Sequence, residues 1–259
     1  MISNGSMLHT DSLIHYTLHL ADNALILSQR NSEWCGHGPV LEQDIAITNI
    51  SLDLLGQARN FYQYAAILIG GTASEDKLAY HRNENEFKNC LLAEQPKGDW
   101  AVTILRQFIF SAYQYLLYRQ LAKSTDHQLA AIASKAVKEV TYHLRWSSEW
   151  VIRLGDGTAE SHARMVNAIQ DLWMFTGELF LPAPYETEIQ NQGIITGVEK
   201  LQQEWITTIE NTFSEATLAL PTDTGWMQTG GKTGRHTEYL GRILAELQYM
   251  QRIYPNCEW

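Results

Sequence analysis

Apolar residues recur at alternating steps of three and four through two long stretches of the sequence, 47–65 and 133–154. The first stripe consists of Ile47, Ile50, Leu54, Ala58, Phe61 and Ala65, and the second of Ala133, Val137, Val140, Leu144, Ser147, Val151 and Leu154. Such steps place the side chains on one face of an α-helix. Helices of some twenty residues each are about 30 Å long, and four of them predict a helical bundle.

The same periodicity predicts the helices of the whole chain. They cover about 11–31, 41–69, 100–123, 127–154, 160–180, 196–214 and 235–252. No run of alternating β-branched residues indicates a sheet. We therefore predict an all-α chain with one domain over 1–259, a bundle core at about 11–180 and additional helices at about 196–252 outside it. Proline and glycine in the segment 182–195 predict a long surface loop.

Composition excludes several classes of protein. The chain has 19 basic and 29 acidic residues, a net charge of −10, so no basic face for nucleic acid is expected. No apolar window reaches the ~18 residues that span a bilayer, and the first thirty residues show no signal peptide. Cys35, Cys90 and Cys257 are widely spaced and odd in number, which favours a reducing cytoplasm over a disulfide framework.

Glu139 and His143 lie four residues apart, so they share a helix face one turn apart. Helical bundles that hold two iron or manganese ions use Glu-x-x-His instead, and the residue three before His143 is Val140. A shift of one residue turns a side chain by about 100° around the helix axis. We therefore expect Glu139 to point away from the place that His143 faces, with the imidazole satisfied by an intrahelical contact, by Glu33 or by a water molecule. A weak cation site or a catalytic role for this pair stays open.

The stretch 52–58 repeats this offset. Asp53 lies four residues before Gln57, and Leu54 lies three before it. If Leu54 and Val140 hold the positions of metal ligands, the neighbouring carboxylates of Asp53 and Glu139 point away from the place where the metal would lie. The pattern indicates the remains of a metal site.

The stretch 225–233, GWMQTGGKT, does not form a phosphate-binding loop. Five residues separate Gly225 from Gly231 where that motif needs four, and no strand precedes it. Basic residues nevertheless gather at the predicted start of the last helix. These are Lys232, Arg235, His236 and Arg242. Because helix N-termini attract anions, contact with an acidic partner or with the phosphates of coenzyme A is a hypothesis for this cluster.

Several stretches together resemble one protein family, the C subunits of ring 1,2-phenylacetyl-CoA epoxidase. They are LSQR at 27–30, EWCGH at 33–37, NISLDLLGQARN at 49–60, EQP at 94–96, KEVTYHLR at 138–145 and TGGKTGRHTE at 229–238. They extend from the first predicted helix to the last. The resemblance implies a ferritin-like fold and a structural subunit without metal.

The resemblance also implies partners and cofactors that this chain does not carry. A related A subunit would hold the di-iron centre, bind phenylacetyl-CoA and epoxidise its ring. Further small subunits would complete the complex, and a reductase with flavin and an iron–sulfur cluster would deliver electrons from NADPH. The chain itself would pair with the A subunit and stabilise it.

The ligand pattern of the catalytic relatives can be carried over by motif. The ligand positions fall on Glu33, Leu54, Gln57, Ser111, Val140 and His143. Only Glu33 and His143 could still bind metal, and two ligands are too few to hold iron firmly. Carboxylates that crowd a core without metal lower the stability of the fold through desolvation and mutual repulsion. Apolar replacements therefore let the bundle fold without a cation.

Two other functions compete with a structural subunit. The chain could itself be a metal-dependent oxidoreductase that uses Glu33, Asp53, Glu139, His143 and His37, although the register of these residues disfavours it. It could also be a free-standing helical binding protein.

Overall fold

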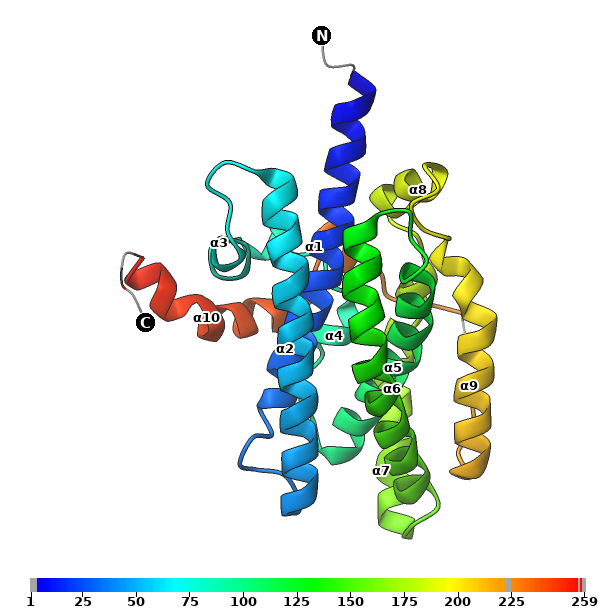
Figure 1. Cartoon of the computed structure of the whole chain (residues 1–259). Coiled ribbons are helices and arrows are strands. Elements are labelled where there is room, and N and C mark those ends of the chain that lie inside the picture. The colour runs from blue at the N-terminus through cyan, green and yellow to red at the C-terminus, as the bar shows by residue number, and fades with distance from the viewer. Residues whose placement is uncertain (1–3, 222–224, 256, 258–259) are drawn as a thin grey trace.

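The computed structural model describes residues 4–221, 225–255 and 257, and within these ranges it contains helices and no strand (Figure 1). Four long helices form a ferritin-like bundle. They are α1 (Asn4–Ser32), α2 (Leu41–Ile69), α5 (Trp100–Leu121) and α6 (His127–Gly155). Helix α1 packs along α2, α5 packs along α6, and α2 also contacts α6. The predicted all-α bundle is confirmed.

Two of the bundle helices, α5 and α6, begin at a side chain that accepts a hydrogen bond from a backbone N–H group of the first turn. Asp99 accepts a hydrogen bond from the backbone N–H of Val102 at the start of α5, and Asp126 accepts one from Leu129 at the start of α6. Such caps satisfy donors that have no partner within the helix. Gly70 follows α2 with φ 73°, a backbone conformation that favours glycine.

Shorter helices complete the fold. They are α3 (Glu75–Tyr80), α4 (Leu91–Glu94), α7 (Ala159–Leu172), α8 (Pro184–Asn191), α9 (Gln202–Glu215) and α10 (Glu238–Ile253), with single 3-10 turns at Glu84–Glu86, Trp173–Phe175, Gly177–Phe180, Val198–Leu201 and Gly231–Thr233. Helix α9 lies against α5 and α6, and α10 against α3 and α4. Neither belongs to the four central helices, as expected.

The prediction of a surface loop over 182–195 is wrong. This segment contains α8, whose Tyr185, Glu186 and Ile189 are buried. Pro184 occupies the first turn of this helix, where its missing N–H costs nothing. The Glu186 carboxylate accepts a hydrogen bond from the backbone N–H of Ala183 at 2.8 Å and so caps the helix.

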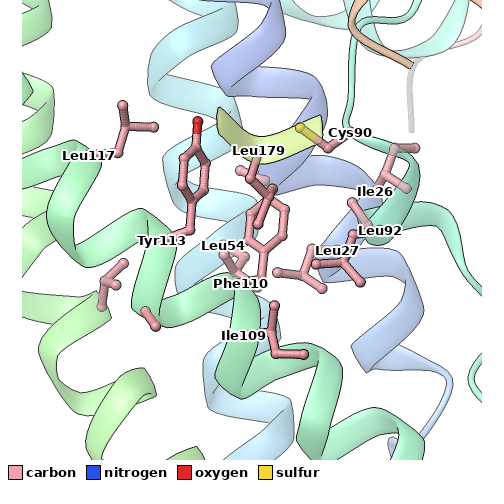
Figure 2. Close-up of a cluster of buried hydrophobic side chains, with 14 of the residues drawn as sticks. Ile26, Leu27, Leu54, Cys90, Leu92, Ile109, Phe110, Tyr113, Leu117 and Leu179 are labelled. Carbon is pink, nitrogen blue, oxygen red and sulfur yellow. The ribbon is translucent and has the colours of Figure 1, made fainter. Parts of the chain in front are cut away.

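Apolar side chains fill the space where the bundle helices meet. Figure 2 shows Leu27 of α1, Leu54 of α2, and Ile109 and Phe110 of α5 in one buried cluster, with Leu179 from the 3-10 turn Gly177–Phe180. None of the helices in the described residues has an apolar stretch of the length that a lipid bilayer requires.

Candidate functional site

The centre of the bundle contains most of the positions that the sequence assigned to metal ligands. Leu54 of α2 and Val140 of α6 are fully buried, as are Ser111 of α5 and His143 of α6, and Gln57 is 2% exposed. The two positions that would hold the glutamates of the Glu-x-x-His motifs therefore hold apolar side chains in close-packed surroundings. Neither Leu54 nor Val140 can bind a cation.

Two polar pairs join α2 to α6 beside these apolar residues. His143 Nε2 lies 3.0 Å from Asp53 Oδ2, and Gln57 Nε2 donates to Glu139 Oε2 at 2.9 Å. Asp53 and Gln57 are one turn apart on α2, and Glu139 and His143 are one turn apart on α6. The order of the pairs is reversed because the two helices run antiparallel. We call these four residues the α2–α6 clamp.

The α2–α6 clamp corrects one expectation about the His143 imidazole and one about Glu139. The partner of His143 is Asp53, and neither Glu33 nor an intrahelical contact with Glu139 satisfies it. Glu139 was expected to point away from the place that His143 faces. It instead faces α2 as His143 does, and accepts a hydrogen bond from Gln57 one helical turn from the Asp53–His143 pair. The Asp53 side chain is 40% exposed while His143 is fully buried, so the carboxylate keeps part of its hydration and the imidazole none. Such a pair ties two helices together without placing an unpaired charge in the core.

Ser111 belongs to a second polar connection, between α1 and α5. Asn31 Nδ2 donates to Gln107 Oε1 at 2.6 Å, and Gln107 Nε2 donates to Ser111 Oγ at 2.7 Å. All three side chains are buried and neutral. Sequence reasoning missed Asn31 and Gln107, although Gln107 lies one helical turn before Ser111.

Glu33 does not belong to the buried group. It lies just beyond the end of α1, is exposed, and pairs with Arg30 at 2.6 Å. The α1 residues that Figure 2 shows in the buried cluster of Leu54 are Ile26 and Leu27. The assignment of a ligand position to Glu33 is therefore wrong, because the inward face of α1 ends before this residue.

Of the alternative set of metal ligands, Asp53 and His143 lie together as a pair, but a third ligand does not join them. His37 is exposed, and its Nδ1 lies 3.0 Å from the backbone oxygen of Cys35. Among the described residues no group of three or more His, Cys, Asp and Glu side chains could hold a metal ion. Because a di-iron centre of this fold needs four carboxylates and two imidazoles, the donor set of this interior does not fit one.

The predicted basic cluster is divided between the interior and the surface. Lys232 is 3% exposed, and its ammonium donates to the Glu186 carboxylate at 2.9 Å and to the backbone oxygen of Leu181 at 3.1 Å. The His236 side chain is fully buried, with Nδ1 2.8 Å from Glu94 Oε2. Burial lowers the pKa of His236, but its hydrogen bond to Glu94 and the charge of that carboxylate outweigh burial and raise it.

Only two residues of this cluster remain at the surface. Arg235 is exposed, and Arg242, also exposed, pairs with Glu238. The expectation of a single basic surface is wrong because the loop before α10 is packed into the fold. Gly230 donates its N–H to Glu178 at 2.8 Å, and a Cβ on Gly231 would lie 2.3 Å from the backbone oxygen of Asn89.

The fold and its interior define a ferritin-like protein in which the buried ligand positions include Leu54, Val140, Ser111 and Gln57, none of them a carboxylate. Comparison with known proteins agrees with this class. The model of a family described as phenylacetic acid catabolic protein matches residues 4–259. The C subunit of the 1,2-phenylacetyl-CoA epoxidase of Escherichia coli (strain K12) is 49% identical over 249 residues, which cover 96% of this chain and 100% of that protein. The chain therefore belongs to the phenylacetic acid catabolic protein family.

Proposed function

We propose that this chain is a structural, non-catalytic subunit of a multicomponent oxygenase that epoxidises the aromatic ring of phenylacetyl-CoA in phenylacetate degradation. The main support for a non-catalytic role is that the fully buried Leu54 and Val140 stand at two positions where a metal site of this fold would have glutamate ligands. The identity to the C subunit of an epoxidase supports the substrate and the reaction.

The oxidative chemistry then belongs to other components of the complex. The proposal assigns the di-iron centre to a related catalytic subunit, and flavin, iron–sulfur cluster and NADPH to a reductase, with further small subunits in the assembly. Cys35, Cys90 and Cys257 are free thiols, which suits a cytoplasmic location.

The contribution of this chain is to stabilise its catalytic partner. A bundle whose centre is apolar at Leu54 and Val140, and whose helices α2 and α6 are joined by the clamp, does not depend on metal to fold. It offers a rigid surface against which a metal-bearing relative can pack.

The substitution His143→Ala in the complete oxygenase tests this proposal. A structural role predicts an epoxidation rate within about threefold of the wild-type complex, with lower thermal stability of this chain because the partner of Asp53 is lost. A fall in kcat of about a hundredfold, the scale for losing a general acid or base, in a complex that still assembles would contradict it. Lys135→Ala, at an exposed position on the same helix α6, is the matched control.

A further inference from the structure

A hollow of about 450 Å³ lies where α1, α8 and two loops meet. Its walls include Ser12 and His15 of α1, Lys88 from the loop before α4, and Pro184 and Tyr185 of α8. We call it the α1–α8 hollow, and Figure 1 shows α8 beside the upper part of α1. None of the described residues at the expected metal-ligand positions lines it. Its volume lies in the range of small-molecule sites, about 300–1,000 Å³.

Lys88 brings an uncompensated positive charge to this hollow. The residue is half-buried, and no oxygen atom of the described chain accepts a hydrogen bond from its ammonium group. Its Nζ lies over the Tyr185 ring, 5.6 Å from the centroid. Burial lowers the pKa of Lys88, the Asp22 charge opposes this shift, and Arg82 adds to it. An anion in the hollow would stabilise the charge that burial disfavours.

The backbone of Lys88 is fixed on both sides. Its N–H donates to Asp22 Oδ2 at 2.8 Å, and its carbonyl oxygen lies 2.7 Å from His19 Nδ1. Asp22 is itself engaged by Arg82 and by the Tyr62 hydroxyl, so its charge is used inside the fold. The Lys88 ammonium is therefore held at the wall of the hollow by contacts that need no ligand, as in a preformed site.

Two neutral polar side chains and an apolar wall complete the site. Ser12 and His15 are three residues apart on one face of α1, and neither has a hydrogen-bond partner in the described chain. The Tyr185 hydroxyl donates to the backbone oxygen of Lys232 at 3.2 Å. The ring of Tyr185 and the neighbouring Pro184 therefore offer carbon atoms to a ligand. A few polar groups among apolar walls are typical of small-molecule sites.

The charges on the wall favour a carboxylate over a phosphate. A second ammonium on the wall, that of Lys232, is engaged with Glu186 at 2.9 Å. Glu188 also lines the hollow, where it accepts a hydrogen bond from Gln192 at 2.9 Å. Phosphate groups are held best by several charged donors or by the fork of an arginine. One uncompensated ammonium and two neutral donors match a single carboxylate instead.

We propose that the α1–α8 hollow binds a small carboxylate with a compact apolar body. The carboxylate accepts hydrogen bonds from Lys88 and from Ser12 or His15, and the apolar body lies against Pro184 and Tyr185. This site adds to the structural role and does not depend on it, because the hollow is formed by this chain alone. Phenylacetate is a suitable probe because it joins one carboxylate to one aromatic ring, and aromatic rings pack well against tyrosine.

Isothermal titration calorimetry with the purified chain tests this proposal. A ligand of about ten non-hydrogen atoms is expected to bind with a Kd on the order of 0.1–1 mM. Lys88→Met removes the charge but keeps the backbone contacts with Asp22 and His19, so the Kd for phenylacetate should rise at least about tenfold. Lys77→Met is the matched control, because Lys77 is exposed on α3 and donates to the backbone oxygen of Thr72. Its Kd should equal that of the wild type.

A second variant and three further probes sharpen the test. His15→Ala, at an exposed position of α1, should raise the Kd roughly threefold. It decides the matter if circular dichroism shows that Lys88→Met does not fold. Acetate and inorganic phosphate lack the apolar body and should bind at least about tenfold more weakly. The probe 2-phenylethylamine carries the opposite charge and should not bind.

Each outcome supports or overturns the site. Binding of phenylacetate that Lys88→Met weakens and Lys77→Met does not supports it. No binding by the wild-type chain, or an equal Kd for the wild type and a folded Lys88→Met, overturns it, as does an unchanged Kd for His15→Ala where Lys88→Met does not fold. Phosphate that binds as tightly as phenylacetate overturns the apolar body. Binding of 2-phenylethylamine in place of phenylacetate overturns the choice of a carboxylate and assigns the selection to Glu188.

Discussion

The centre of the bundle and the loop before α10 differ in the side chains that they bury: those at the centre are uncharged, and those around the loop include paired charged groups. At the centre, Leu54, Val140 and Ser111 are fully buried and uncharged. Around the loop, Lys232 pairs with Glu186 and His236 with Glu94, and all four side chains are at most 4% exposed. The fold accepts buried charge where a partner and several hydrogen bonds are available. Where a metal would have supplied the opposite charge, carboxylates are absent.

The largest effect is expected from returning a carboxylate to the centre. Leu54→Glu should lower the free energy of unfolding by about 5 kcal/mol at neutral pH, because it removes a packed side chain and buries an unpaired acid. The loss should shrink as the pH falls, since burial favours the protonated acid. Urea denaturation measures both. Leu55→Glu, on the exposed side of the same helix, is the control and should change stability little.

Removing one partner from the loop region should cost slightly less. Glu186→Leu leaves the Lys232 ammonium buried with only backbone oxygens as acceptors, and the expected loss is about 4 kcal/mol. Replacing both residues, with Lys232→Met added, should restore more than half of this loss, because no unpaired charge then remains. A double variant as unstable as the single one would show that packing or the lost cap of α8, and not the unpaired charge, explains the effect.

A smaller effect concerns two imidazoles near this loop. His19 is fully buried; burial lowers its pKa to about 4, although the Glu186 charge opposes this shift. Its Nδ1 lies 2.7 Å from the backbone oxygen of Lys88, whereas His236 has a carboxylate partner and a raised pKa. The unfolded chain therefore binds the proton of His19 more tightly, so stability is lost as the pH falls from about 6.5 to about 4.

This loss amounts to about 3 kcal/mol from the His19 imidazole, at 1.36 kcal/mol for each pKa unit. Denaturation of the wild-type chain and of His19→Asn at several pH values isolates it, because the carboxylates of both proteins titrate alike. Parallel stability curves between pH 4 and 6.5 would show that His19 can take up its proton in the folded chain.

The long helices could be predicted because each carries its own apolar stripe. The ends of α2 at Leu41 and Ile69 were predicted to the residue. Helix α8 could not be predicted from periodicity, because it is only a turn or two long and stands between proline and glycine. Pro184 and Glu186 do carry a start signal, but the same residues also occur in turns.

The contacts of the site were harder to predict because they join distant parts of the chain. The spacing of Glu139 and His143 placed them on one face of α6, yet their partners on α2 lie 82 and 90 residues away. The same limit applies to Lys232 and His236. The sequence predicts a surface cluster for them, whereas the structure pairs them inside the fold with Glu186 and Glu94. Residue type alone does not reveal whether a charge is paired and buried.

The central claim is that this chain holds no metal of its own, and its metal content tests that claim most directly. The chain is purified alone from iron-replete cells, dialysed, and analysed for iron and manganese by plasma mass spectrometry. The account predicts far less than one ion per chain, because Leu54 and Val140 occupy ligand positions. Retention of about two ions per chain, the content of a di-metal bundle, would contradict it and point to a catalytic role for this chain.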